Sequence, residues 1–263
     1  MGEVIVITSG KGGVGKTTTT ANIGTALAAM GKKTILLDTD IGLRNLDVVM
    51  GLENRIVYDL VDVVTGNCRL RQGFIKDKKL DTLYMIPAAQ TREKTDVTQK
   101  QMVDLTLRLK EEFDYILIDC PAGIEQGFKN AIAGADKALV VTTPEVSAVR
   151  DADRVIGLLE AAGIGEPRVI VNRIRYDMVK KGNMMNVEDI LEILAVELIG
   201  VVPDDEAIVI STNCGEPVAK NELSRSGKSF RAIARRILGE TVPFVEPRMG
   251  FGLWHKIRNG FGR

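Results

Sequence analysis

Short apolar runs alternate with longer segments of helical periodicity along most of the chain. Seven runs have strand character because apolar residues fill successive positions, as expected for strands covered on both faces. They are 3–8, 34–38, 82–87, 115–119, 138–143, 168–172 and 198–203. The helical segments between them are 17–30, 98–112, 147–162, 187–196 and 225–238. This alternation with short connections predicts an α/β fold built on a doubly wound, mainly parallel sheet.

The same pattern predicts one large domain and a separate C-terminal segment. With 263 residues, of which 5% are aromatic, the chain is long enough for one mainly aliphatic core. We expect the domain to cover residues 1–240, a connector containing two prolines to cover 241–249, and an amphipathic helix to cover 250–263.

Charge and cysteine content exclude some classes of protein. The 35 basic residues balance the 35 acidic ones, which argues against a surface coated for nucleic acid. Cys68, Cys120 and Cys214 lack metal-ligand spacing and are expected to be reduced, structural thiols of a cytosolic protein. The N-terminus does not resemble a signal peptide, and no apolar run approaches the ~20 residues of a transmembrane helix.

A glycine-rich motif follows the first predicted strand. The stretch GKGGVGKTT at 10–18 fits the P-loop pattern in the context that pattern requires, after a strand and before a helix. Its backbone N–H groups and the helix N-terminus favour phosphate. We expect Lys16 to reach the β- and γ-phosphates, Thr17 to bind Mg²⁺ and Thr18 to reach the α-phosphate. The expected nucleotide-binding residues of the loop are Gly10, Lys11, Gly12, Gly13, Val14, Gly15, Lys16, Thr17 and Thr18.

Three carboxylates follow strands at the sheet edge where α/β proteins bind ligands. Asp38 and Asp119 end apolar strands, and Asp40 follows two residues after the first of them. A single aspartate in such a place is more often a turn or helix-cap residue, but three beside a P-loop favour a Mg²⁺ site. Thr17, Asp38 and Asp119 are the expected metal residues, and Gly123 is placed to offer its N–H to the γ-phosphate.

The second lysine of the loop, Lys11, is not required by the general P-loop. GKGGVGKTT resembles the deviant Walker A motif of the MinD/ParA family, which are SIMIBI-type P-loop NTPases. In that family this lysine crosses a dimer interface to the partner's nucleotide. The resemblance therefore implies an ATP-dependent homodimer, with ATP and Mg²⁺ as cofactors and Lys11, Lys16 and Asp40 as catalytic residues. Asp40 would position the attacking water.

The resemblance also implies residues for the base. Asn172 would hydrogen-bond adenine, and Arg173 and Pro203 would flank the ring. An ordinary strand-end turn remains the alternative for Asn172.

Four longer stretches resemble the MinD branch of this family. They are SGKGGVGKTTTTANIGTALA, LLDTDIGLRNLDVVMGLENR, DYILIDCPAGIEQGF and TTPEVSAVRDADRVIGLLE, and the resemblance covers nearly the whole chain. It implies a membrane-cycling ATPase that recruits the division inhibitor MinC to position the septum, with the activator MinE as a further candidate partner. Ser147, Arg150 and Asp151 would belong to the partner surface. A ParA-like DNA-partition ATPase and an FlhG-like flagellar-number ATPase are the alternatives, although nucleic acid is not expected as a partner.

The C-terminal segment separates into two sides when it is placed on a helical wheel of ~100° per residue. Its apolar side carries the segment's bulky residues, and Lys256 and Arg258 lie on the polar side and at the border. Packing on its own domain is one reading of this pattern. Combined with the family resemblance, the pattern predicts peripheral binding to anionic lipid on the cytoplasmic face of the membrane. The expected membrane residues are Phe251, Leu253, Trp254, Lys256, Ile257, Arg258 and Phe261.

A single such tail is expected to bind marginally. Burying about 400 Å² of apolar surface yields roughly 10 kcal/mol, and ordering about 11 residues costs on the order of 1 kcal/mol each. Two tails on one ATP-bound dimer would bind with avidity, so ATP would load the protein on the membrane and hydrolysis would release it.

Overall fold

The structure of the chain is a computed structural model that describes residues 1–92 and 96–244. The predicted membrane helix at 250–263 and residues 245–249 of the connector lie outside the described residues. No helix in the described ranges is long and apolar enough to cross a membrane.

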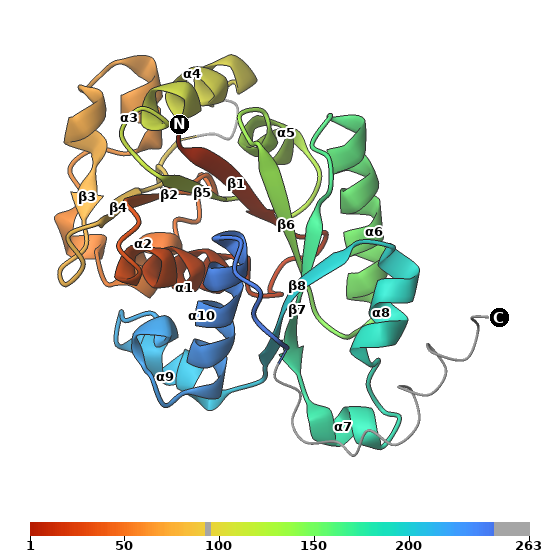
Figure 1. Cartoon of the computed structure of the whole chain (residues 1–263). Helices are drawn as coiled ribbons and strands as arrows, with labels where there is room; N and C mark the ends of the chain where they lie inside the picture. Colours follow the sequence, from red (N-terminus) through yellow and green to blue (C-terminus); the bar gives the residue numbers. More distant parts are fainter. Residues whose placement is uncertain (93–95, 245–263) are drawn as a thin grey trace.

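An eight-stranded sheet forms the centre of the fold, in the order β3-β4-β2-β5-β1-β6-β7-β8 (Figure 1). All neighbouring strands are parallel except β3 and β4. The strands are β1 Glu3–Thr8, β2 Thr34–Asp38, β3 Ile75–Lys76, β4 Leu83–Ile86, β5 Tyr115–Asp119, β6 Lys137–Thr142, β7 Arg168–Ile174 and β8 Glu197–Pro203. The predicted doubly wound, mainly parallel sheet is confirmed.

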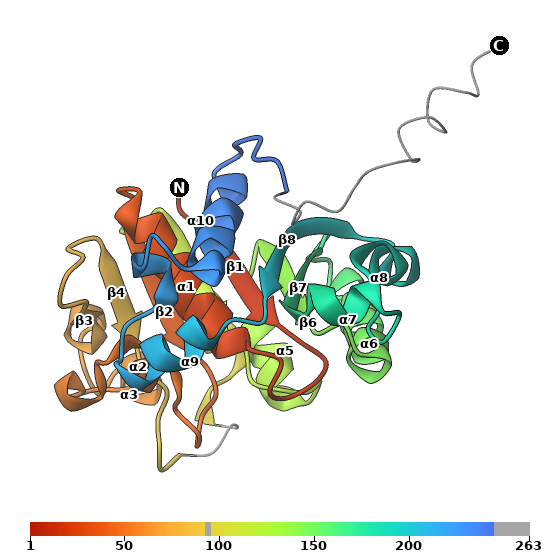
Figure 2. The same cartoon turned by 90° about the horizontal axis from the view of Figure 1, so that it is seen from below.

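Helices cover both faces of this sheet (Figures 1 and 2). They are α1 Lys16–Ala29, α2 Leu46–Met50, α3 Leu60–Thr65, α4 Gln99–Leu109, α5 Gln126–Ile132, α6 Val146–Ala161, α7 Tyr176–Lys180, α8 Val187–Leu194, α9 Glu206–Asn213 and α10 Arg225–Ile237. A short 3-10 helix, η4 Val218–Lys220, precedes α10. Helices α1, α2 and α10 pack on one face, and α3, α4, α5, α6 and α8 pack on the other.

The strands supply side chains to two separate cores because successive residues point to opposite faces. In β1, Val4 and Val6 belong to the core under α4, α5 and α6, whereas Ile5 and Ile7 belong to the core under α1 and α10. All four are fully buried. This explains why the strand is apolar at every position.

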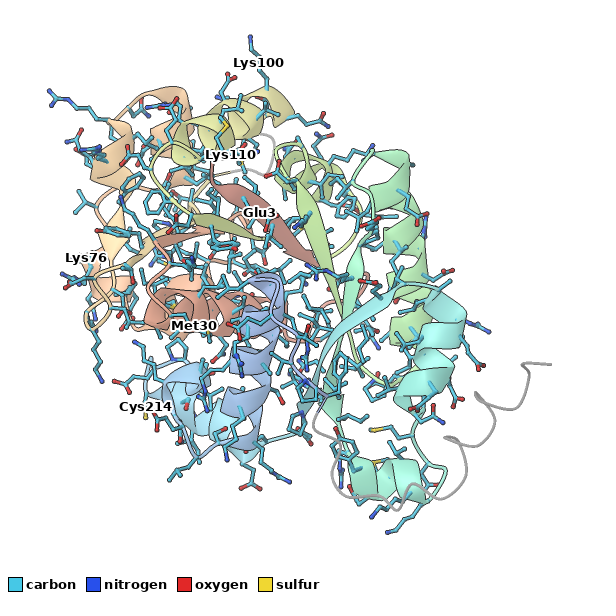
Figure 3. All side chains as sticks on the ribbon, viewed as in Figure 1. Glu3, Met30, Lys76, Lys100, Lys110 and Cys214 are labelled. Atoms are coloured by element: carbon cyan, nitrogen blue, oxygen red, sulfur yellow. The ribbon has the colours of Figure 1, made fainter. Side chains whose placement is uncertain are left out.

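The elements that sequence patterning missed are short. Helices α2, α3, α5, α7 and α9 have five to eight residues, too few for a helical period to repeat. Strand β3 has two residues and lies antiparallel at the sheet edge. Its exposed Lys76 points outward from that edge (Figure 3) and binds Asp81 at 2.7 Å, a charge that discourages pairing with another strand.

The topology brings the loops after β1, β2 and β5 to one edge. Strand β1 is central, between β5 and β6, and the chain winds outward from it in both directions. Such a switch point is where open parallel sheets bind ligands, beyond the carboxyl ends of the strands.

Candidate nucleotide-binding site

The loop between β1 and α1 contains three glycines, Gly10, Gly13 and Gly15, that no other residue can replace without strain. Gly13 and Gly15 have φ values of 79° and 98°, in the left-handed region. A Cβ at Gly15 would lie 2.4 Å from Nδ2 of Asn172, and one at Gly10 would lie 2.2 Å from the backbone oxygen of Asp151. The loop is therefore wedged between β7 and the first half of α6.

Lys16 begins α1 and its side chain is buried inside the loop. Its Nζ donates to Ser9 Oγ at 3.0 Å, and this hydroxyl donates to the backbone oxygen of Lys11 at 2.7 Å. The ammonium group is thus held at the N-terminus of α1, where backbone N–H groups also favour anions.

Asp38 and Asp119 end neighbouring strands and are paired in register across β2 and β5. Both are buried. Burial and the neighbouring Asp119 raise the pKa of Asp38 to about 8, although it accepts hydrogen bonds from the N–H groups of Asp40 and Leu46. Burial likewise raises the pKa of Asp119 to about 7, against the hydrogen bonds from Thr17 and Thr20 and the charge of Lys16.

The carboxylate oxygens of Asp38 and Asp119 suit a hard cation. Thr20 Oγ1 donates to Asp119 Oδ1 at 3.2 Å, and Thr17 also hydrogen-bonds this carboxylate, so it lies directly beside the first two turns of α1. Over the described ranges, no group of three or more His, Cys, Asp or Glu forms a metal cage. The donor set fits Mg²⁺, which usually binds one or two protein oxygens and takes the rest from phosphate and water.

The loops after β2 and β5 are tied to each other. Thr39 makes two hydrogen bonds to the backbone oxygen of Asp119. Its backbone N–H donates at 3.1 Å, and its hydroxyl donates at 2.7 Å. Gly123 has a φ of 91°, and a Cβ added at Gly12 would meet the Cβ of Ala122 at 3.7 Å. The loop that carries Gly123 therefore contacts the P-loop, and Asp40 lies on the loop joined to it through Thr39.

Asn172 has contacts that the sequence did not predict. Its Nδ2 donates to the oxygen of Val14 at 2.7 Å, and its Oδ1 accepts from the N–H of Arg173 at 3.0 Å. Arg173 has a φ of 58°, and Pro203 pairs with Ile174 at the end of β7. The structure thus brings Asn172 into contact with the P-loop and places Arg173 and Pro203 at the same end of β7 and β8, and the contact of all three with adenine stays a prediction.

Lys11 lies on the surface beside α6. Its Nζ donates to Ser147 Oγ at 3.3 Å and lies 3.6 Å from Glu145 Oε2. Ser147, Arg150 and Asp151 are exposed on α6, so the expected partner surface adjoins the P-loop. Glu145 was missed because nothing in its sequence context distinguishes it from a helix-cap residue.

The fold and the loop define a P-loop nucleotide-binding protein. The profile of the CobQ/CobB/MinD/ParA nucleotide binding domain matches residues 5–218. The chain is 59% identical to the septum site-determining protein MinD of Bacillus subtilis (strain 168), over 100% of this chain and 99% of that protein.

Solved structures agree with this match. The MinC:MinD cell division protein complex of Aquifex aeolicus contains a chain with a TM-score of 0.87 and 50% identity, covering 93% of this chain and 99% of that one. The septum site-determining protein MinD of Pyrococcus horikoshii OT3, complexed with Mg-ADP, has a TM-score of 0.82 and 31% identity, covering 90% and 96%.

The chain therefore belongs to the MinD family of septum site-determining ATPases. It is an ATPase of cell division, and the partition and flagellar-number alternatives are not favoured.

Proposed function

We propose that the chain binds ATP and Mg²⁺ at the P-loop and cycles between a free state and a membrane-bound dimer. Lys16 binds the β- and γ-phosphates. Thr17, Asp38 and Asp119 hold Mg²⁺ with the phosphates and water. Asp40 orients the attacking water. The Mg-ADP bound to the Pyrococcus horikoshii relative supports this choice of cofactors.

The observation that carries the proposal is the different placement of two lysines in one loop. Lys16 is buried against Ser9, whereas Lys11 is exposed at the rim of the site. An exposed, rotatable ammonium group at the rim is available to the nucleotide of a second copy. The developing charge of phosphoryl transfer is stabilised mainly by cations, so pairing would switch hydrolysis on.

The output of the switch is attachment of the C-terminal segment to anionic lipid. Because the free energy of binding one tail is near zero, two tails on a dimer are needed for a stable complex. ATP would place the protein on the cytoplasmic face of the membrane, and hydrolysis would return it to the cytoplasm.

The membrane-bound dimer recruits MinC through the α6 surface of Ser147, Arg150 and Asp151. The MinC:MinD complex of Aquifex aeolicus supports MinC as a partner. MinE is the activator we propose, acting near the same surface, where Lys11 contacts Ser147.

Sedimentation with vesicles of phosphatidylglycerol and phosphatidylethanolamine tests the membrane cycle. We expect the wild type to sediment at least tenfold more strongly with a non-hydrolysable ATP analogue than with ADP. Ile257→Glu should abolish sedimentation, and Asn259→Glu on the polar side is the matched charge control. Equal sedimentation with both nucleotides would refute the coupling. Capture of purified MinC on the same vesicles then tests recruitment.

A further inference from the structure

Arg236 in the last turn of α10 holds two separate backbone segments. Its Nη1 donates to the oxygen of Ile199 in β8 at 2.9 Å. Its Nε and Nη2 donate to the oxygens of Val242 and Pro243 at 3.1 and 3.2 Å. Its Cζ lies 3.9 Å from the centroid of the Phe244 ring. One guanidinium group thus fixes the chain that leaves α10 against the edge of the sheet.

The chain after α10 reaches Arg236 by reversing direction. Gly239 has a φ of 84°, and the N–H groups of Gly239 and Glu240 donate to the oxygens of Arg236 and Arg235. This left-handed glycine ends the helix and turns the chain back along it. The first residues of the expected connector therefore lie on the domain rather than away from it.

Arg236 contacts more groups than the edge of the sheet needs, since it reaches three backbone oxygens and one aromatic ring. Strand β8 is the last strand of the sheet, and one hydrogen-bond donor satisfies the carbonyl of Ile199. A lysine side chain could also donate this one hydrogen bond at the sheet edge. Only a planar, multi-donor group that stacks on an aromatic ring can hold three carbonyls and Phe244 together.

We propose that Arg236, with Phe244, is a positioning residue that anchors the root of the C-terminal membrane segment. This inference rests on the proposed membrane function. Five residues separate Phe244 from Gly250, where the amphipathic segment begins, but ten separate Gly239 from it. The effective concentration of a second tail falls roughly as the −3/2 power of tether length, so release of the anchor lowers it about threefold.

The test measures vesicle affinity of the full chain carrying Arg236→Met. Arg235→Met is the matched control, because it removes the same charge one residue away and breaks only an exposed ion pair with Glu240. Phe244→Ala is a second variant that loosens the anchor without leaving the Ile199 carbonyl unpaired. Each variant is first checked for wild-type ATP affinity and a cooperative thermal transition.

With the non-hydrolysable ATP analogue, we expect the vesicle Kd of Arg236→Met to rise about threefold over that of Arg235→Met. The vesicle Kd of Phe244→Ala should also rise. With ADP, where one tail acts alone, the two arginine variants should bind equally. ATP hydrolysis without vesicles should be unchanged.

Two results would overturn the inference while leaving the membrane cycle intact. One is an equal Kd for the Arg236 and Arg235 variants with the ATP analogue. The other is an equal loss with ADP and with the ATP analogue, which would mean that Arg236 contacts lipid itself. Failure of the wild type to prefer the ATP analogue would instead refute the proposed membrane function, and this inference with it.

Discussion

Lys11 and Lys16 lie five residues apart in one loop but face different surroundings. The ammonium group of Lys16 is inside the loop on Ser9, and that of Lys11 is at the surface beside Ser147 and Glu145. Substitution of Lys16 should therefore impair ATP binding, whereas substitution of Lys11 should impair hydrolysis. We expect Lys16→Ala to weaken ATP binding at least tenfold, since it removes a charged group from the phosphate site.

Lys11→Ala should leave ATP affinity within about twofold of the wild type and lower hydrolysis about 100-fold or more. A fluorescent ATP analogue measures binding, and phosphate release measures turnover. Comparable loss of ATP binding in both variants would show that Lys11 binds the nucleotide of its own chain.

Asp119 should be required for Mg²⁺ but not for folding. Its carboxylate is buried beside that of Asp38, whose pKa it helps to raise, and replacing one of two such groups with a neutral amide relieves their repulsion. We expect Asp119→Asn to fold with a Tm at or above that of the wild type, and to lose the stimulation of ATP hydrolysis by Mg²⁺. Asp104→Asn, on the exposed side of α4, is the control. Mg²⁺ stimulation that persists in Asp119→Asn would exclude this metal assignment.

Gly10 and Gly12 provide a test of how the P-loop is packed. A Cβ at Gly10 would overlap the backbone of Asp151, whereas one at Gly12 meets only an ordinary contact with Ala122. Gly10→Ala should destabilise the chain by about 1–3 kcal/mol, which lowers the Tm by roughly 2–4 °C per kcal/mol. Gly12→Ala should melt within about 1 °C of the wild type. Thermal denaturation without nucleotide measures both, and equal Tm values would contradict the close approach of α6.

Asp205 should contribute a pH-dependent part of the stability. Burial alone would raise its pKa, but hydrogen bonds from the N–H and hydroxyl of Ser226, the N–H of Ala207 and the hydroxyl of Ser224 outweigh burial and lower it. A carboxylate with a lowered pKa in the folded state stabilises above its unfolded pKa of about 3.9, and this stability is lost as pH falls through the folded value.

We therefore expect Asp205→Asn to lower the free energy of unfolding by about 2 kcal/mol at pH 7. The difference from the wild type should shrink below about pH 4. Urea denaturation at pH 7 and pH 3.5 measures it, with the exposed neighbour Asp204→Asn as control. A difference that is the same at both values would show that the charge of Asp205 is not the cause.

Much of the fold was predictable because it depends on local patterns. Continuous apolar runs marked every strand of the parallel sheet, and β1, β2 and β5 begin and end where expected. The longer helices were found to within a few residues. The five short helices were not, because their position depends on contacts with the strands beside them rather than on a repeated period.

The candidate site was predictable where its residues share one motif. The P-loop and the strand-end aspartates have sequence signatures, and the sheet brings them together. The contact between Asn172 and Val14 spans 158 positions, and Arg236 acts on backbone carbonyls. Every residue has a carbonyl, so such partners leave no signal in the sequence.

Mixing two inactive variants tests the completion of the ATP site by a second chain most directly. In a dimer of one Lys11→Ala chain and one Asp40→Ala chain, the first chain keeps its own Asp40 and would receive Lys11 from its partner. Half of the pairs in an equal mixture are mixed, each with one complete site of two, so hydrolysis should recover to about a quarter of the wild-type rate. A mixture as inactive as its two components would contradict the account, because it would place Lys11 and Asp40 at the same chain's nucleotide.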